Sequence, residues 1–301
     1  MVEFIVPTGY EPGNTKPHGG TRPYIPVQMM LPNGGWSKPV TFNFDTGAST
    51  PTDIPLSLLG DFGYKEVRNG NTRPTYNKKV IIPGFNVGGG SSTAGTDSPI
   101  VMTIPCMLND RDHYDLFREQ PTRKPLLRVR DLMPYVSIVY QLRQTIIRTR
   151  DMGPPPELNT PGTIMFPDAK QRSGTPTSSW YWNKWTIINP KQTSKRYKDW
   201  FQWCTGDWRM IVKRSIVDKV DIDRKRIDSD NSDAYASFEF TESTPQPPIA
   251  GLKNVLIDAR DDDADFARGG VPRNICGGLS LLKSWSRVIW DSHSAAIPVV
   301  T

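Results

Sequence analysis

Apolar and polar residues alternate along two neighbouring segments near the N-terminus. Residues 24–31 are mostly apolar, and within residues 38–44 every second position from Val40 to Phe44 is apolar. A period of two is typical of a half-buried strand, and the intervening Pro-Asn-Gly-Gly is a strong turn signal. The pattern therefore predicts a β-hairpin whose second strand ends at Asp45.

Other parts of the chain carry weaker patterns. Short apolar runs predict further strands at residues 3–7, 80–83, 100–108, 255–257, 288–291 and 297–300. Apolar residues recur at steps of three and four from Ser194 to Val220, which predicts an amphipathic helix capped by Ser194. The strand ending at Pro83 opens into a glycine-rich stretch over residues 84–95, where we expect a mobile tip.

Composition favours a mainly β protein. The chain has 301 residues, of which only 37% are apolar, with 28 prolines and 24 glycines. A helix-rich enzyme is normally richer in apolar residues and poorer in turn formers. The length allows one large domain or two ordinary ones.

Charge and tryptophan concentrate in the middle of the chain. Residues 111–230 hold 23 Lys/Arg against 14 Asp/Glu, and six of the nine tryptophans lie between Trp180 and Trp208. Basic side chains interleaved with aromatic rings are a pattern of single-strand nucleic-acid binding, which would map to residues 180–226. The alternative is that the rings form a local core beneath a solvated, mixed-charge surface.

The cysteines and histidines give no sign of a metal or a cofactor. The three cysteines are widely spaced and odd in number, which argues against a disulfide framework and suits a reducing compartment. The three histidines share no metal-ligand spacing with them. The sequence contains no apolar run of membrane-spanning length and no signal-peptide layout. We therefore expect an intracellular, cytoplasmic protein with no metal, no cofactor and no membrane association.

The most informative motif follows the predicted hairpin directly. Asp45-Thr46-Gly47 is followed by Ala48-Ser49, so a carboxylate stands at the end of an apolar strand, where neighbouring donors can orient it. A carboxylate held in this way can activate a water molecule. The simpler interpretation is a strand that ends in a turn, since these residue types are common there.

Residues 42–49 resemble the active-site motif of retropepsins, the dimeric aspartic proteases of retroviruses and retrotransposons. The glycine-rich stretch stands in the place of their flap, and Asn274-Ile275-Cys276-Gly277 with Leu281-Leu282 looks like the run that packs beneath their active site. The resemblance implies a mainly β, closed-barrel half-site domain from residues 1–109 and 251–301. Residues 110–250 would then be a large mixed α/β, Trp-rich insertion.

The resemblance also implies an activity. Aspartic proteases use two carboxylates, one protonated and one ionised, around one water. The chain has no second Asp-Thr-Gly or Asp-Ser-Gly, so the second carboxylate would come from Asp45 of another copy. The expectation is a homodimeric endopeptidase acting on a peptide or polyprotein.

The same resemblance assigns roles to particular residues. Asp45 would be catalytic, Thr46 and Gly47 would brace it, and the substrate would contact Ala48, Ser49, Gly88, Gly89 and Gly90. The apolar terminal segments 4–6 and 297–300 would suit an interleaved dimer sheet, although edge strands of one subunit are the alternative.

A second hypothesis is a non-catalytic binding or assembly module on the same fold. Gly278-Leu279 stands where the family has Arg followed by Asp or Asn, and the expected insertion is large. A fold does not by itself determine function.

Overall fold

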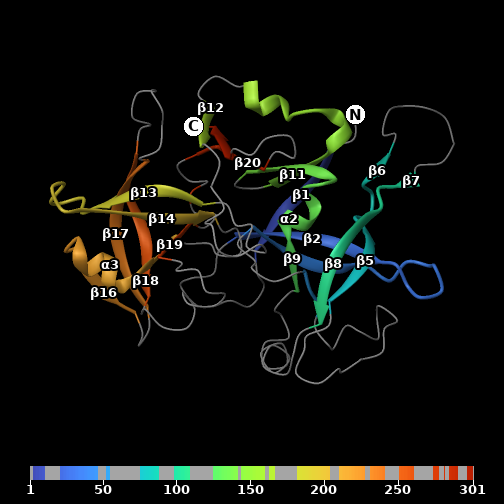
Figure 1. Ribbon diagram of the computed structural model, residues 1–301, viewed down its shortest axis with the longest axis horizontal. Helices are drawn as coiled ribbons and strands as arrows, with labels where there is room; N and C mark the ends of the chain where they lie inside the picture. Colours follow the sequence, from blue (N-terminus) through green and yellow to red (C-terminus); the bar gives the residue numbers. More distant parts are fainter. Residues whose placement is uncertain are drawn as a thin grey trace.

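The computed structural model shows a mainly β protein made of two lobes with a shared sheet between them (Figure 1). It describes residues 3–10, 21–46, 52–54, 75–87, 98–108, 125–141, 144–159, 163–166, 182–203, 210–227, 231–240, 251–260, 274–277, 281, 285–290 and 297–300. No helix among these residues is long and apolar enough to cross a membrane.

The first lobe is a curled sheet built around the predicted hairpin. Its elements are β2 (Thr21–Met29), β3 (Val40–Asp45), β4 (Thr52–Ile54), β5 (Thr75–Ile81), β8 (Met102–Leu108), β9 (Leu126–Arg128) and the short helix α2 (Val129–Leu132). β2 pairs antiparallel with β3 from Tyr24↔Asn43 to Val27↔Val40, which confirms the hairpin. A small separate hairpin joins β6 (Asn86–Val87) to β7 (Ser98–Pro99).

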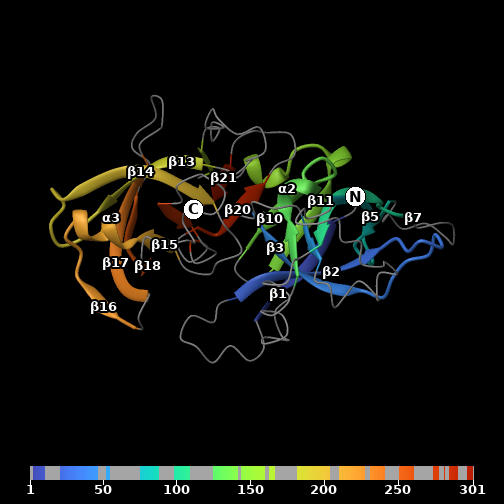
Figure 2. The ribbon, with the colours of Figure 1, turned by 60° about the horizontal axis from the view of Figure 1, so that its bottom comes forward.

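A run of six antiparallel strands lies between the lobes in Figures 1 and 2. In spatial order these are β12 (Thr163–Phe166), β21 (Ile297–Val300), β20 (Arg287–Trp290), β10 (Val136–Tyr140), β11 (Gln144–Thr149) and β1 (Glu3–Tyr10). The short 3-10 helices η2 (Arg150–Met152) and η3 (Pro156–Asn159) follow β11. Both terminal strands are therefore interior strands of one intrachain sheet, and neither is a free edge.

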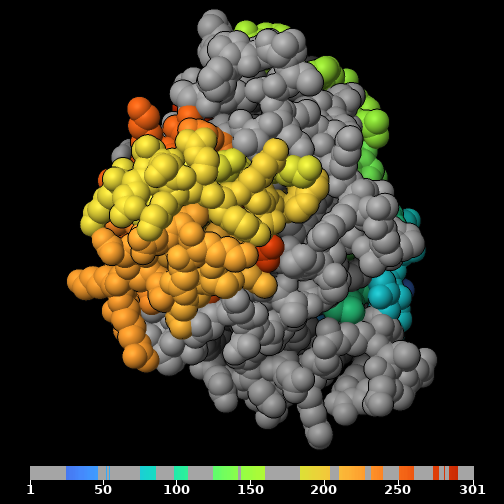
Figure 3. Space-filling view, turned by 60° about the vertical axis from the view of Figure 1, so that its left-hand side comes forward, coloured from blue at the N-terminus to red at the C-terminus, as the bar shows by residue number. Residues whose placement is uncertain are grey.

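The second lobe is a closed barrel. Its six strands run in the order β13 (Trp182–Ile188), β14 (Arg196–Trp203), β19 (Ile275–Gly277), β15 (Met210–Lys213), β18 (Leu252–Arg260) and β17 (Asn231–Phe240), and β17 pairs back with β13. Short β16 (Arg224–Arg226) extends β17 outside the ring, and α3 (Arg214–Lys219) follows β15. Figure 3 shows β13 and β14 (yellow) lying across the outer face of this lobe.

Two tryptophans of the barrel are part of its core. Trp185 and Trp203 are buried, and Trp185 stacks on Phe201 with ring centroids 3.5 Å apart. These two rings cannot stack on nucleic-acid bases, because they are covered by the protein. Trp200 is half-buried and carries the Lys184 ammonium 4.9 Å from its ring centroid.

The helix expected over residues 194–220 is wrong. The structure has β14, then β15, and a helix only at α3. The apolar steps of three and four arose because two strands with buried ends follow one another closely. Tyr197, Phe201 and Trp203 contribute to the core from strand geometry instead.

Pairing across the sequence joins the expected insertion to the expected protease domain. β9 to β12 come from residues 126–166, yet they belong to the same extended sheet as β1 to β5. The buried apolar side chains of both lobes also form one continuous core. The chain therefore folds as one unit with two lobes. The retropepsin resemblance implied a chain with a single half-site and a separate insertion, and the structure replaces it with two lobes in one chain.

Candidate active site at the junction of the two lobes

Asp45 is held at the inner end of β3 by packing on both sides. Phe42 and Phe44 before it have no exposed surface, and Asp45 itself is only 8% exposed. β3 is a central strand, with β2 on one side and β9 on the other, where Asp45 pairs in parallel with Arg128. Burial of the preceding phenylalanines therefore fixes where the carboxylate emerges.

Thr46 connects the two lobes. Its hydroxyl donates to the carbonyl oxygen of Trp203 at 3.3 Å, and the two residues lie 157 positions apart. Both are buried, at 5% and 2% exposed. The end of β3 in the first lobe thus meets the end of β14 in the second.

The two strand ends have matching surroundings. In the first lobe β3 pairs in parallel with β9, from Asn43↔Leu126 to Asp45↔Arg128. In the second lobe β14 pairs in parallel with β19, from Phe201↔Ile275 to Trp203↔Gly277. Parallel pairing is otherwise limited, among the described strands, to β4 with β8 and β15 with β18. Each lobe therefore contributes one half-site to the junction.

The Thr-Gly pairs that follow the two strands are preceded by different residues. β3 ends at Asp45, which is followed in the sequence by Thr46-Gly47, whereas β14 ends at Trp203 and is followed by Cys204-Thr205-Gly206. The Thr-Gly pairs correspond, so a cysteine stands in the sequence where the second carboxylate would be. Residues 204–206 lie outside the described residues. Sequence reasoning missed this half-site because it searched for a second aspartate and not for the Thr-Gly that follows it.

The run expected beneath Asp45 serves the other lobe. Ile275–Gly277 forms β19 against β14, while Leu126–Arg128 of β9 takes the place beside β3. A Cβ at Gly277 would lie 1.8 Å from the Phe201 ring, so glycine is required for this close approach. Sequence analysis did not identify β9 as the partner of β3, although the consecutive leucines of β9 were a signal for a strand.

A buried ion pair supports the strand beside Asp45. Arg128 binds Asp131 through Nη2 at 2.6 Å and Nε at 3.0 Å, and its backbone N–H donates to the Thr52 hydroxyl at 3.2 Å. Burial raises the pKa of Asp131, although the hydrogen bond from Arg128 opposes that shift. The network ties β9, α2 and β4 together at the base of the site.

The other predicted site residues cannot be placed. Gly47, Ala48 and Ser49 and the flap residues Gly88, Gly89 and Gly90 lie outside the described residues. The strands that enter the expected flap, β6 and β7, lie at the end of the molecule away from the barrel in Figures 1 and 2. Within the described part of the chain, no three His, Cys, Asp or Glu side chains gather as a metal site.

Comparison with solved structures identifies the fold. The aspartic proteinase from Irpex lacteus is similar over 99% of this chain and 97% of its own, with a TM-score of 0.52 and 12% identity. The crystal structure of edgp is similar over 99% of this chain and 94% of its own, with a TM-score of 0.51 and 12% identity. A retropepsin-like aspartic protease from Rickettsia conorii matches 46% of this chain and 90% of its own, with a TM-score of 0.29 and 14% identity.

Sequence comparison adds no family. No protein-family model matches the chain, and no curated protein matches its sequence. The whole-chain likeness shows a two-lobed, pepsin-like aspartic-protease fold and corrects the narrower retropepsin interpretation. At this level of identity, activity has to be argued from the site itself.

Proposed function

We propose that this protein is a non-hydrolytic binding module on an aspartic-protease-like fold, which holds an extended polypeptide segment at the junction of its lobes. One observation carries the proposal. The two half-sites meet through Thr46 and Trp203, and in the sequence only the first has an aspartate directly before its Thr-Gly pair, where the second has Cys204.

The missing carboxylate removes the acid–base pair. Two aspartates sharing a site repel one another, so one keeps its proton and acts as the acid while the other acts as the base. A cysteine thiol has an ordinary pKa of about 8.5 and is neutral in acid solution. A neutral thiol facing Asp45 would exert no such repulsion on it, and the site would then have no shared proton to drive this hydrolysis.

A second copy is a poor source of the missing group. The hydroxyl of Thr46 already donates to Trp203 of the same chain, and Asp45 is buried. A homodimer that paired two Asp45 carboxylates would have to displace the chain's own second half-site. The homodimeric endopeptidase is the competing hypothesis.

The proposed ligand is a polypeptide because of the local architecture. The ends of β3 and β14 bring strands from both lobes to one place, and the junction of two lobes is a common place for a ligand, here an extended segment lying across it. Binding without cleavage needs that geometry but no catalytic pair. Intracellular location stays an expectation from the three cysteines, of which Cys106 and Cys276 are buried.

The test is a cleavage assay paired with a binding assay. The wild-type protein and Asp45→Asn are incubated between pH 3 and pH 6 with a mixed peptide library, and both the bound and the free peptides are analysed by mass spectrometry. We expect full-length bound peptides and identical, background cleavage in both proteins. Cleavage by the wild type that Asp45→Asn abolishes would establish the endopeptidase instead.

A gain-of-function variant tests the reason for inactivity. Cys204→Asp restores a second carboxylate after Trp203, so we expect new cleavage at acid pH that disappears again in the double variant Asp45→Asn/Cys204→Asp. Cys204→Ser is the matched control, since it changes the same side chain without adding a carboxylate. Cleavage by the serine variant would contradict the assignment.

A further inference from the structure

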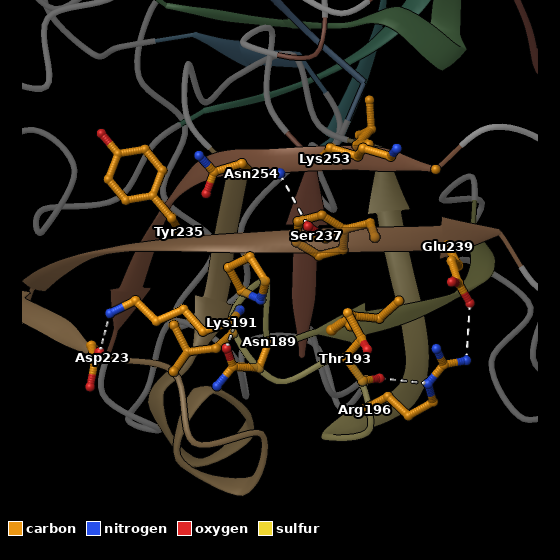
Figure 4. Close-up of a pocket in the computed structure, with 16 residues that line it drawn as sticks. Asn189, Lys191, Thr193, Arg196, Asp223, Tyr235, Ser237, Glu239, Lys253 and Asn254 are labelled. Atoms are coloured by element: carbon orange, nitrogen blue, oxygen red, sulfur yellow. Dashed lines mark hydrogen bonds and ion pairs between the residues drawn. The ribbon is translucent and has the colours of Figure 1, made fainter.

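A cavity of about 700 Å³ lies on the barrel lobe, apart from the residues of the Asp45 junction. It lies between the turn that joins β13 to β14 and the neighbouring strands β17 and β18, as Figure 4 shows. Its apolar lining comes from Ile188, Ile222, Phe238 and Leu252. An apolar floor with a few polar groups around it is the usual composition of a small-molecule site.

The turn that covers this cavity is held in place by polar contacts. The Asn189 side-chain amide donates to the carbonyl oxygens of Val220 and Asp221, at 3.1 and 2.5 Å. An ion pair joins Lys191 to Asp223 at 2.7 Å. These contacts hold the turn against the segment after α3. The cavity therefore has its shape without a ligand.

A second ion pair lies at the other end of the cavity. Arg196 of β14 pairs with Glu239 of β17 at 3.2 Å, and its Nε donates to the Thr193 carbonyl oxygen. Figure 4 shows this pair and the Lys191–Asp223 pair on opposite sides of the site. Both rim carboxylates are consequently neutralised by a cation.

Backbone strain is concentrated around the same cavity. Among the described residues, only Asp221 and Asn254 combine a side chain other than glycine with a positive φ, of 54° and 52°. Asn254 lines the cavity, and Asp221 precedes the lining residue Ile222. Asn254 lies at an irregularity in the β17–β18 pairing, where its N–H donates to the Ser237 hydroxyl at 3.1 Å. Strained backbone and irregular strand pairing occur preferentially at functional sites.

Two lining side chains remain available to a ligand. Tyr235 is 52% exposed, and with Val101 it makes up the exposed large apolar side chains of the described chain. Lys253 is exposed and makes no ion pair with any residue that the structure describes. Since Lys191 and Arg196 are balanced by Asp223 and Glu239, Lys253 leaves one positive charge uncompensated at the rim.

We propose that this cavity binds a small molecule that combines a planar apolar ring with an anionic group. The ring would stack against Tyr235 and contact the apolar floor, and the anion would lie toward Lys253. The Asn254 side-chain amide, beside Tyr235 in Figure 4, can donate to a polar group on the ring. This site does not depend on the polypeptide-binding proposal, because it uses a different surface of the molecule.

The test uses three probes that share a ring and differ in charge: 2-naphthoate, 2-naphthylmethanol and 2-naphthylmethylamine. Each is titrated into the full chain at pH 7 by calorimetry. We expect saturable binding, strongest for the naphthoate and weakest for the amine. Absence of saturable naphthoate binding up to about 1 mM, or a preference for the amine, would overturn the proposal.

Three variants locate the binding. Tyr235→Ala should weaken all three probes by about tenfold, because the stacking surface is lost. Lys253→Gln should leave the alcohol unchanged and bring the naphthoate down to its level. Val101→Ala is the matched control, an exposed apolar truncation in the other lobe, and should change nothing. Unchanged naphthoate affinity in Tyr235→Ala would show that the probe binds elsewhere and would refute this site.

Discussion

At the scale of single residues, the position of Asp45 depends on neighbours that carry no chemistry. Phe42 and Phe44 hold β3 in the core, and Gly277 lets β19 approach the Phe201 ring of β14. The first lobe and the second lobe therefore rely on different residues to build corresponding half-sites. One of these dependences can be measured directly.

Gly277→Ala is expected to destabilise the protein by roughly 1–3 kcal/mol, because its Cβ would overlap two atoms of the Phe201 ring. Urea unfolding measures the change. Gly35→Ala is the control, since its Cβ would meet only the exposed Asn33 side chain, at 3.2 Å. Equal stability of the two variants would show that β19 can move away from β14.

Asp131 should make stability depend on pH in an unusual direction. Burial raises the pKa of this carboxyl above its ordinary value of 3.8, so the folded state binds the proton more tightly than the unfolded state. Its contribution is complete below pH 3.8 and is lost as pH rises through the folded pKa. Asp131→Asn should remove that decline, which urea midpoints between pH 3 and pH 7 would show. Asp151→Asn, at an exposed position, should keep it.

At the scale of elements, a buried ion pair joins the central sheet to the 3-10 helix η3 that follows β11. Arg148 of β11 binds Glu157 of η3 through two contacts, at 2.6 and 2.8 Å, and both side chains are less than a tenth exposed. The pair holds the segment after β11 against the sheet. Removing one partner leaves a buried charge with weaker compensation.

Glu157→Gln should therefore cost about 3 kcal/mol of unfolding free energy. Glu239→Gln breaks the exposed Arg196 pair and should cost less than about 1 kcal/mol. Thermal and urea unfolding of both variants measure the contrast. Similar small losses would mean that β11 and η3 are held by apolar packing alone.

At the scale of the whole molecule, the arrangement of half-sites predicts the oligomeric state. Both half-sites come from one chain, and the terminal strands β1 and β21 are internal members of its central sheet. The surfaces that a retropepsin monomer would leave for its partner are already occupied. We expect sedimentation at micromolar concentration to give a monomer of 33.9 kDa. A stable species of twice that mass would revive the homodimer expected from the sequence.

The sequence by itself determined the features that depend on neighbouring residues. Alternation and turn chemistry were enough for the hairpin that leads to Asp45 and for the strands β8, β20 and β21, because period-two burial and tight turns are local properties. The mainly β composition pointed to the correct class. The Asp-Thr-Gly motif pointed to an aspartic-protease-like fold, which the whole-chain structural likeness supports.

Only the tertiary structure decided which segments meet. The parallel pairs β3–β9 and β14–β19 join residues far apart in the chain, and no local pattern encodes such a partner. Burial of three successive residues at the end of β14, 201–203, also hid the strand character of this segment, whose apolar spacing imitated a helix. The contact of Thr46 with Trp203 then revealed that Cys204, and not a second aspartate, follows the second half-site. The sequence specifies which side chain stands at each position, but the role of that side chain depends on the residues that folding places next to it.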